Sequence, residues 1–306
     1  MAVAKKSSKG YRGYASPLGI FLFLFPALLG YTVFTVLPIG VQCVYSLLKW
    51  KGYTPLLQFN NFYYYTVMFQ DKYFWGSLIN NVRIWILGAF LEIPIALLLA
   101  FILSRRVRGV GFFRVLYYIP QIIPVLFLAM IFKFLITQEY GLNGLLRAVG
   151  LGNFIQPWLS KDGLSQWVIG IPGTWQGVGF WIVIFIAAIA GVSEELFEAA
   201  QLDGANDMQL LRYITLPSIR SVVVFAYIML GLGAIQSFMW QFLIPSAPGA
   251  PMGQNHTLGS YIAELAMSYR STSNLGYAST LSVSLFVISV VATVIVWRVN
   301  QWSQER

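Results

Sequence analysis

The sequence is poor in the residues that build disulfides, metal sites and hydrolytic active sites. Its 306 residues include one cysteine, Cys43, and one histidine, His256. A disulfide needs two thiols and a metal site usually needs three or four ligands, so neither is expected within the chain. The sequence contains no G-x-S-x-G nucleophile motif and no G-x-x-x-x-G-K-[ST] phosphate loop. We therefore expect that the chain is not an enzyme by itself.

Charged residues are also scarce. Only 10% of the residues are Asp, Glu, Lys or Arg, whereas 58% are hydrophobic and 16% are aromatic. A soluble domain cannot hide that much apolar surface, so the composition predicts a membrane protein. The formal net charge of +9 comes from short basic clusters between apolar runs, with no DNA- or RNA-reading motif around them. We expect contact with membrane lipid and no nucleic-acid partner.

Six apolar runs are long enough to cross a hydrocarbon core, which takes about 20 residues in a helix. The prediction is an all-α membrane protein with six transmembrane helices, at residues 18–48, 75–104, 112–136, 167–190, 219–242 and 277–297. With the N-terminus inside the cell, twelve Lys and Arg residues fall in inner segments and seven in outer segments. Basic residues are retained on the cytoplasmic side, so both termini are expected in the cytoplasm.

The two ends of the chain flank these runs. Residues 1–17 are expected to form a basic cytoplasmic segment, and residues 301–306 a short cytoplasmic tail. The first apolar run is too long for a secretory signal and lacks a small-residue cleavage site, so it predicts a retained helix. Pro26 and Pro38 lie inside this run and predict kinks.

The polar segment between the fourth and fifth runs has the signals of two short helices joined by a turn. Ser193 is placed to cap the first helix, and Glu194 and Glu195 follow in its first turn, where negative charge suits the helix dipole. Asp203 and Gly204 are expected to end that helix, since glycine enters the left-handed conformation without a steric penalty.

The second short helix of this segment is expected to begin at Asn206 and Asp207. Arg212 would then lie in its last turn. Pro217 would lie where the fifth span begins, a position at which the missing amide hydrogen costs nothing. The segment therefore predicts an ordered connection.

The first short helix is also expected to offer a surface to a partner. Leu196, Ala199 and Ala200 have the spacing of one helix face, which would be small and apolar. Five of the eleven acidic residues lie between positions 194 and 207. Helices that rest on a membrane normally carry Lys and Arg on their polar face, so the acids favour docking on a protein.

Within this segment, the residues Glu198-Ala199-Ala200, Gly204 and Ile214-Thr215-Leu216-Pro217 form the pattern E-A-A-x3-G-x9-I-x-L-P. Other stretches add to the match: Phe59-Asn60-Asn61-Phe62-Tyr63, Arg105-Arg106-Val107-Arg108-Gly109, Phe113-Arg114, Ile119-Pro120, Glu139-Tyr140-Gly141-Leu142-Asn143, Thr174-Trp175-Gln176-Gly177-Val178-Gly179-Phe180 and Leu275-Gly276-Tyr277-Ala278-Ser279. Over about residues 18–300 the sequence resembles the permease subunits of binding-protein-dependent ABC importers. It is similar to the carbohydrate-uptake branch, which includes maltose and glycerol-phosphate permeases.

The resemblance implies a set of partners in a bacterial or archaeal cytoplasmic (inner) membrane. These are a second permease subunit, two ATPase subunits, an extracytoplasmic solute-binding protein and a carbohydrate substrate. No cofactor is expected in this chain, because ATP and magnesium would be bound by the ATPase. In such permeases the Glu-Ala-Ala helix inserts into a groove on the ATPase. The resemblance thus implies a role in ATPase coupling for Glu198, Ala199, Ala200, Gly204, Ile214 and Pro217.

The resemblance also implies where the substrate passes, since contacts in the family cluster at the start of the fourth span and in the outer half of the fifth. The corresponding residues are Gln176, Gly177, Phe180, Gln236, Ser237, Trp240 and Gln241. For each one the alternative is an aromatic at the membrane interface or a small residue at a helix contact. Gly173, Gly177 and Gly179 further predict that the backbone departs from a regular helix here.

Two charged residues lie inside the second run. Arg83 is close enough to the outer surface to reach it with its long side chain. Glu92, just before Pro94, lies deeper and has two interpretations. It could hydrogen-bond a neighbouring helix of a permease, or bind a coupling cation in an ion-coupled secondary transporter. The second interpretation predicts inverted internal repeats, and the sequence shows none.

Overall fold

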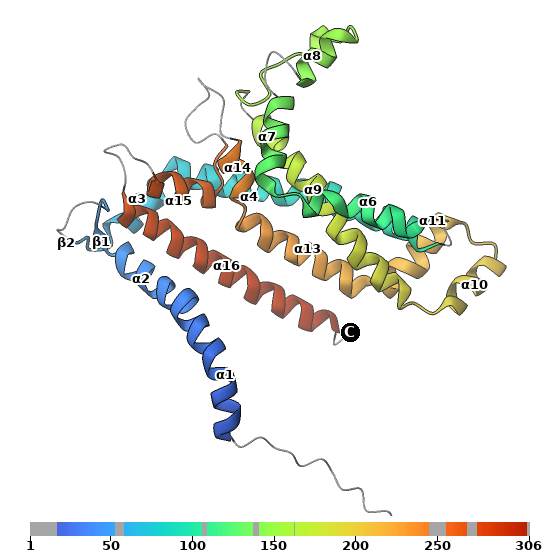
Figure 1. The fold of residues 1–306 in the computed structure, drawn as a ribbon, viewed down its shortest axis with the longest axis horizontal. Helices are drawn as coiled ribbons and strands as arrows, with labels where there is room; N and C mark the ends of the chain where they lie inside the picture. The colour runs from blue at the N-terminus through green and yellow to red at the C-terminus, as the bar shows by residue number, and fades with distance from the viewer. Residues whose placement is uncertain are drawn as a thin grey trace, which may run out of the picture.

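The protein is a bundle of long helices with shorter elements at both ends (Figure 1). The computed structural model describes residues 17–52, 58–105, 109–136, 141–161, 163–244, 255–267 and 274–304. The predicted N-terminal segment up to residue 16 lies outside the described residues, as do residues 305 and 306 of the predicted tail.

The first half of the chain contains α1 (Pro17–Tyr31), the π-helical η1 (Thr32–Val36), α2 (Leu37–Ser46), β1 (Leu48–Lys49), β2 (Gln58–Phe59), α3 (Tyr63–Gln70), α4 (Lys72–Leu87), the π-helical η2 (Gly88–Glu92), α5 (Ile93–Ser104), α6 (Val110–Ile122), α7 (Val125–Leu135) and α8 (Gly141–Ala148). The second half contains the 3-10 turn η3 (Gly152–Phe154), α9 (Ser165–Ala190), α10 (Glu194–Leu202), α11 (Asp207–Gln209), the π-helical η4 (Leu210–Thr215), α12 (Leu216–Ser218), α13 (Arg220–Ile235), α14 (Met239–Leu243), α15 (Leu258–Met267) and α16 (Leu275–Gln304). β1 and β2 form a short antiparallel pair.

Five helices in the described part of the chain are long and apolar enough to cross a membrane. They are Leu18–Ser46, Lys72–Ser104, Ser165–Ala190, Arg220–Leu243 and Leu275–Ile295. The count becomes six if the bent pair α6 and α7 is one span. The prediction of a helical protein with several membrane-length apolar helices is therefore confirmed, and five of the six predicted runs form single apolar helices; the count of six stays a prediction.

The third predicted run, residues 112–136, is not one straight helix. α6 ends at Ile122, α7 begins at Val125, and the two are bent by 87°. Proline disfavours the helical conformation in the residue before it, and Ile123, which precedes Pro124, is extended at φ −70° and ψ 127°. Because Pro124 has no amide hydrogen, the carbonyl of Pro120 also loses its usual helical partner. Figure 1 shows α7 leaving the bundle at a steep angle to α6.

Prolines also explain three π-helical segments. η1 ends two residues before Pro38, η2 two residues before Pro94, and η4 two residues before Pro217. A proline ring clashes with the carbonyl one turn earlier, and a wider π turn moves that carbonyl away. The first span therefore contains a π-helical segment before Pro38 and continues as one helix from Leu18 to Ser46, and Pro26 lies inside α1.

The prediction of broken backbone around Gly173, Gly177 and Gly179 is wrong. α9 runs without interruption from Ser165 to Ala190 and includes all three glycines. Their physical role is close approach, since a Cβ on Gly179 would lie 2.1 Å from the carbonyl oxygen of Tyr117 in α6. Glycine at these positions allows neighbouring elements to contact the α9 backbone.

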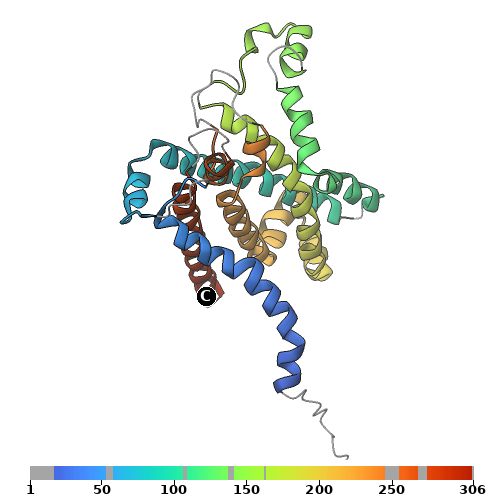
Figure 2. The same ribbon diagram turned by 60° about the vertical axis from the view of Figure 1, so that its left-hand side comes forward.

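The largest buried cluster surrounds α9. Ile182 and Phe185 of α9 are fully buried against Ile93 and Ala96 of α5, and Leu210 of η4 joins the same cluster. α1 packs differently, because it extends away from the bundle in both views (Figures 1 and 2) and its large apolar side chains are exposed. α1 thus offers an apolar surface to lipid or to another subunit.

The short elements mark two ends of the bundle. α10, α11 and the C-terminal end of α16 lie toward one end, and β1, β2, α3 and α15 lie at the other (Figure 1). At the second end, the carboxylate of Asp71 accepts hydrogen bonds from the hydroxyls of Tyr261 (2.8 Å) and Tyr277 (2.6 Å). Asp71 also caps α4, so one side chain joins α4, α15 and α16.

Candidate functional site

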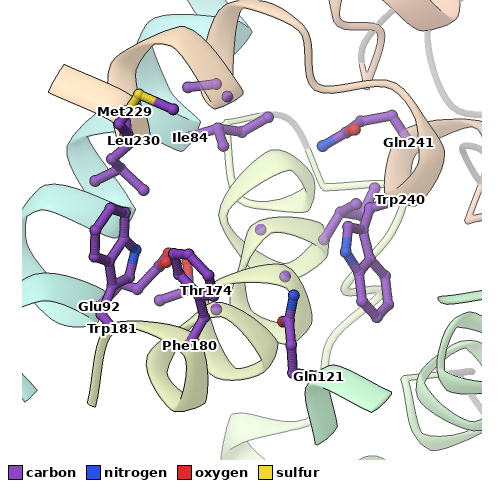
Figure 3. A pocket seen from close by; sticks show the side chains of 16 residues that line it. Ile84, Glu92, Gln121, Thr174, Phe180, Trp181, Met229, Leu230, Trp240 and Gln241 are labelled. Atoms are coloured by element: carbon purple, nitrogen blue, oxygen red, sulfur yellow. The ribbon is translucent and has the colours of Figure 1, made fainter. Parts of the chain in front are cut away.

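A cavity of about 300 Å³ lies among α4, η2, α6, α9, α13 and α14. Its lining combines four hydrogen-bonding side chains with three aromatic rings (Figure 3), and these are Glu92, Gln121, Thr174 and Gln241, with Phe180, Trp181 and Trp240. Glu92, Thr174 and Gln241 are buried, and burial of polar groups inside an apolar bundle is costly unless they are paired or bind something. The cavity is therefore the first candidate site.

Glu92 enters the cavity because the backbone around it is unusual. It is the last residue of η2, directly before α5, which begins at Ile93, and its side chain is buried. The carboxylate touches the backbone of α9 at Gly177, where a Cβ would lie 2.1 Å from Oε1 of Glu92. Trp181 hydrogen-bonds to the same carboxylate, and the two side chains lie together in Figure 3. Glu92 thus makes the contact to a neighbouring helix that one of its two interpretations expected.

Trp240 faces Glu92 from the far side of the cavity (Figure 3). Its indole contacts α9 at Gly173, where a Cβ would lie 3.0 Å from the Trp240 Nε1 atom. The ring of Phe132 in α7 packs edge-on against Trp240 at 6.1 Å between centroids. α14 is a separate short helix after the break at residues 236–238, and this break turns Trp240 and Gln241 toward α9.

Four of the seven predicted path residues line the cavity, namely Gly177, Phe180, Trp240 and Gln241. Gln236 is exposed at the end of α13. Ser237 donates a hydrogen bond to Oε1 of Gln241 at 3.1 Å, so it supports a lining residue from behind. A role in a substrate path stays a prediction for each of them.

Gln176 has a different place from the one expected. Its side-chain amide donates to the carbonyl oxygens of Pro120 (3.2 Å) and Ile123 (3.3 Å) at the bend between α6 and α7. The Pro120 carbonyl is the one that Pro124 leaves without a helical partner. Gln176 therefore stabilises the bend between α6 and α7.

Replacing Gln176 with leucine is expected to lower the free energy of unfolding by about 1–3 kcal/mol, because two carbonyls lose their donor. Thermal unfolding of the purified protein measures this change. Asn in place of Gln176 keeps a donor on a shorter side chain and is the matched control. Equal stability of the leucine variant and the unchanged protein would contradict this role.

Sequence reasoning missed Gln121 and Thr174 as lining residues and did not place Glu92 there. Gln121 lines the cavity at the end of α6, next to the bend that follows Ile122. The predicted straight third span gave no reason to place its side chain there. Thr174 lies one turn before Gly177 on α9, so helical spacing from Gly177 was an available signal.

The second candidate site is the segment 193–218, which we call the elbow. α10 ends in a glycine turn: Gly204 has φ +82°, its amide donates to the Gln201 carbonyl, and the Ala205 amide donates to the Ala200 carbonyl. The next helix starts with a reciprocal capping box between Asn206 and Gln209. The predicted helix–turn–helix is confirmed at both of these termini.

Three details of the elbow differ from the predictions. Ser193 precedes α10 but makes no side-chain capping bond. Ala200 packs on the core whereas Leu196 and Ala199 are exposed, so the predicted shared face is divided between two environments. Pro217 lies in the short α12, and the fifth span begins at Arg220. α10 has one face toward the core and one toward the exterior. Phe197 and Ala200 lie on the core-facing side, so Leu196 and Ala199 are left on the exposed side.

Several large apolar side chains of the elbow are exposed. Leu202 is 90% exposed, Met208 and Tyr213 are each 65% exposed, and Leu196 is 49% exposed. Glu198 of α10 is exposed as well. These apolar side chains make the elbow a candidate protein-binding segment.

The elbow is held to the bundle by packing and by charge. Leu210 and Leu211 are buried in the cluster around α9. Arg105, at the end of α5, pairs with Asp207 at 2.5 Å between Nη1 and Oδ1. The elbow is therefore in direct contact with α5 and with the cluster around α9.

Residues 255–260, at the opposite end of the bundle, form a buried polar connection to α4, α9 and α13. Asn80 donates to the His256 carbonyl at 2.8 Å, and Asn81 accepts from the Leu258 amide at 3.0 Å. Thr257 donates to the Ser237 carbonyl. This connection fixes the start of α15 beside the break at residues 236–238 in the fifth span.

His256 is a partly buried titratable residue of this connection. Its Nε2 lies 2.6 Å from the Glu264 carboxylate, whereas Nδ1 is buried and has no hydrogen-bond partner among the described residues. Burial lowers the pKa of His256, and the charge of Glu264 partly opposes this shift. Protonation of the folded state would place a second N–H at the unpaired nitrogen, so the folded protein favours neutral histidine.

We expect the free energy of unfolding to fall as the pH drops below about 6.5, the pKa of a free histidine. A histidine whose folded pKa is lowered stabilises the fold above that pH, and this contribution is lost as the pH falls through the folded pKa. Unfolding midpoints between pH 8 and pH 5 measure it. His256→Gln keeps a donor toward Glu264 but does not titrate, and an identical pH profile for both proteins would contradict the prediction.

The membrane-length apolar helices and the internal cavity are the features that a membrane transport protein needs. A model of the family described as binding-protein-dependent transport system inner membrane component matches residues 92–303. This match covers well over half of the chain. The chain belongs to this family of binding-protein-dependent transport components.

Curated relatives and solved structures agree with this family. The diacetylchitobiose uptake permease NgcF of Streptomyces coelicolor is 31% identical over 89% of this chain and 79% of its own length. The lactose permease LacF of Rhizobium radiobacter is 27% identical over 89% of each chain. A bacterial ABC transporter that imports the acidic polysaccharide alginate has the same fold, with a TM-score of 0.75, 21% identity and coverage of 94% of this chain and 95% of its own.

Proposed function

We propose that the chain is a transmembrane permease subunit of an ATP-driven sugar importer. Family membership supports a transport role, and the relatives described above are named for disaccharide uptake. The observation that carries the proposal is a polar, aromatic-lined cavity inside the same helices that hold the exposed elbow. The same chain thus offers a cavity that can bind a solute and a surface on which an ATPase subunit can dock.

The cavity has the chemistry that a sugar needs. Glu92, Gln121 and Gln241 offer acceptors and donors for hydroxyl groups, and Trp240 and Phe180 offer apolar faces for a pyranose ring. Gly177 and Gly173 let these groups approach α9 closely. We place part of the translocation path in this cavity, with the remainder contributed by a second permease subunit.

The elbow supports coupling to an ATPase. Its exposed apolar side chains provide surface that would be buried when an ATPase subunit binds. Glu198 offers a carboxylate to a basic or amide group of that subunit. The buried side chains of the elbow connect it to α5, which directly follows Glu92, and to α9, which contains Gly177. Closure of two ATPase subunits, with their ATP and magnesium, would then reshape the cavity through these helices.

This assignment also gives an orientation. With the elbow facing the ATPase, the elbow end of the bundle is cytoplasmic, and the C-terminal end of α16 lies on the same side (Figure 1). Both termini would be cytoplasmic in a bacterial or archaeal inner membrane. The end with α15 and the β1–β2 pair would face the extracytoplasmic solute-binding protein.

The test is reconstitution of the complete complex in vesicles. We expect sugar uptake that requires ATP on the elbow side and a solute-binding protein on the other side. Omission of the ATPase is the control and is expected to abolish uptake. Uptake driven by an ion gradient without the ATPase would contradict the proposal and support the ion-coupled alternative through Glu92.

A further inference from the structure

Unpaired polar atoms are concentrated where α9 begins beside residues 255–260. Seven buried side-chain nitrogen or oxygen atoms in the described part of the chain have no hydrogen-bond partner, and four of them belong to Gln166, Asn255 and His256. Gln166 is 2% exposed and Asn255 is 1% exposed. Both amide atoms of Gln166, Nε2 and Oε1, are among the four.

A buried amide without partners destabilises a folded protein. Nearly all buried polar side chains in proteins are paired, because an unpaired one loses its hydrogen bonds to water and gains none in return. A methionine has a similar unbranched shape and would fill the position of Gln166 without that loss. The amide at this position therefore points to a partner that is bound only during part of the protein's working cycle.

Gln166 lies on the face of α9 that lines the cavity. Ile169 and Gly170, three and four residues later, are lining residues, and Gly173 continues the same face by a further turn. Gln166 is therefore one turn beyond the cavity, at the end of α9 that adjoins residues 255–260. Side chains of a helix incline toward its N-terminal end, so the amide of Gln166 is directed toward this end and away from the cavity.

The elements at this end of the cavity meet at what we call the seam, which consists of Ser165 and Gln166 of α9, residues 255–260 and the break at residues 236–238. The hydroxyl of Ser165 donates to Oδ1 of Asn255, which joins α9 to residues 255–260. Thr257 donates to the Ser237 carbonyl, which joins the same residues to the fifth span. The cavity lining in α9 begins at Ile169. The seam thus lies between the cavity and the end of the bundle that carries α15.

Resting on the proposed role of the cavity as a sugar path, we propose that the seam is the entrance through which a solute reaches the cavity, and that Gln166 and Asn255 bind its hydroxyl groups there. The Gln166 amide offers donors and an acceptor, and Nδ2 of Asn255 offers donors. These atoms are unpaired while the seam is closed. A hydroxyl-rich solute pairs them when α9 and residues 255–260 separate, a step that breaks the Ser165–Asn255 hydrogen bond.

The first experiment measures access to the seam in vesicles that contain the whole transporter with its solute-binding protein. Gln166→Cys is made in a protein whose exposed Cys43 is replaced by serine, and a membrane-impermeant thiol reagent is added on the side of α15. We expect labelling in one nucleotide state and loss of labelling in the other. Ala96→Cys, at a fully buried position in the cluster around α9, is the control and is expected to stay unlabelled in both states.

The second experiment tests whether the Gln166 amide contacts the solute. Gln166→Met removes the unpaired polar atoms, so its unfolding temperature is expected to equal or exceed that of the unchanged protein. Its uptake of a sugar below saturation is expected to fall about two- to tenfold, the effect of one lost hydrogen bond. The sugars are a panel of mono- and disaccharides that includes lactose and diacetylchitobiose. A purely structural amide would give the opposite pattern, a lower unfolding temperature with normal uptake by the folded protein.

The outcomes separate this proposal from the proposed function. Labelling of Gln166→Cys that is absent in both nucleotide states, or equal in both, would overturn the entrance. Normal uptake by Gln166→Met would overturn the contact with the solute. Absence of ATP-driven uptake by the unchanged complex, with the state-dependent labelling intact, would overturn the sugar function and leave the entrance supported.

Discussion

Replacing Gly177 with alanine is expected to reduce sugar uptake by about tenfold or more, the effect of one uncompensated clash in a packed interior. The new Cβ would lie 2.1 Å from Oε1 and 2.6 Å from the carboxyl carbon of Glu92. Glu92 cannot retreat toward Gly88, where Leu230 already occupies the space. The variant therefore displaces Glu92 and narrows the cavity. Uptake by reconstituted vesicles measures the loss.

Gly76→Ala is the matched control for this change. Gly76 is also a glycine inside a membrane-spanning helix, and a Cβ there meets no atom within 4 Å. Its uptake is expected to equal that of the unchanged protein. Shortening the carboxyl side chain with Glu92→Asp in the Gly177→Ala background is expected to restore part of the uptake. Normal uptake in Gly177→Ala itself would refute the cavity as the route.

Replacing Gly204 with proline is expected to leave the protein inserted in the membrane but to uncouple transport from ATP hydrolysis. Gly204 has φ +82°, whereas proline requires a φ near about −65°. Proline also lacks the amide that donates to the Gln201 carbonyl at 3.0 Å. The turn between α10 and α11 would change direction, so the exposed face of α10 would no longer meet its partner. Uptake and ATP hydrolysis, measured on the same vesicles, report the uncoupling.

Gly150→Pro is a control with the same local defect elsewhere. Gly150 has φ +78° in the connection after α8, its amide donates to the Arg147 carbonyl, and a Cβ there also meets no atom within 4 Å. It is expected to keep uptake and ATP hydrolysis coupled. Glu198→Lys, which reverses one exposed charge on α10, is expected to uncouple without any backbone change. Coupled transport at the normal rate in both elbow variants would exclude a role of the elbow in coupling ATP hydrolysis to transport.

The long helices could be predicted from the sequence because their signal is additive. Each span needs many apolar residues in a row, and no single neighbour decides the outcome. The elbow was predictable for a related reason, since a positive φ at Gly204 and a capping box at Asn206 and Gln209 depend on residues close in sequence. Local chemistry determines both features.

The bend at Pro124 and the unbroken α9 were not predicted, because both depend on contacts between helices. The α6–α7 bend requires a donor for the Pro120 carbonyl, and that donor, Gln176, lies on another helix. The glycines of α9 signal close contact only when their partners, Glu92, Tyr117 and Trp240, are known. The lining of the cavity escaped prediction for the same reason, because Gln121 enters it from α6 only at the bend.

The central claim is that the elbow binds the ATPase subunit and couples ATP hydrolysis to transport. The direct test places a single cysteine at Leu202, the most exposed apolar side chain of the elbow, in a protein whose Cys43 is replaced by serine. A short thiol-reactive crosslinker is then added to membranes that contain the whole transporter. The account predicts a covalent product between this position and the ATPase subunit, with a yield that changes when ATP is bound. The account would be contradicted if Leu202→Cys reacted only with water-soluble reagents or with lipid. In that case no crosslinked product with the ATPase would form with or without bound ATP.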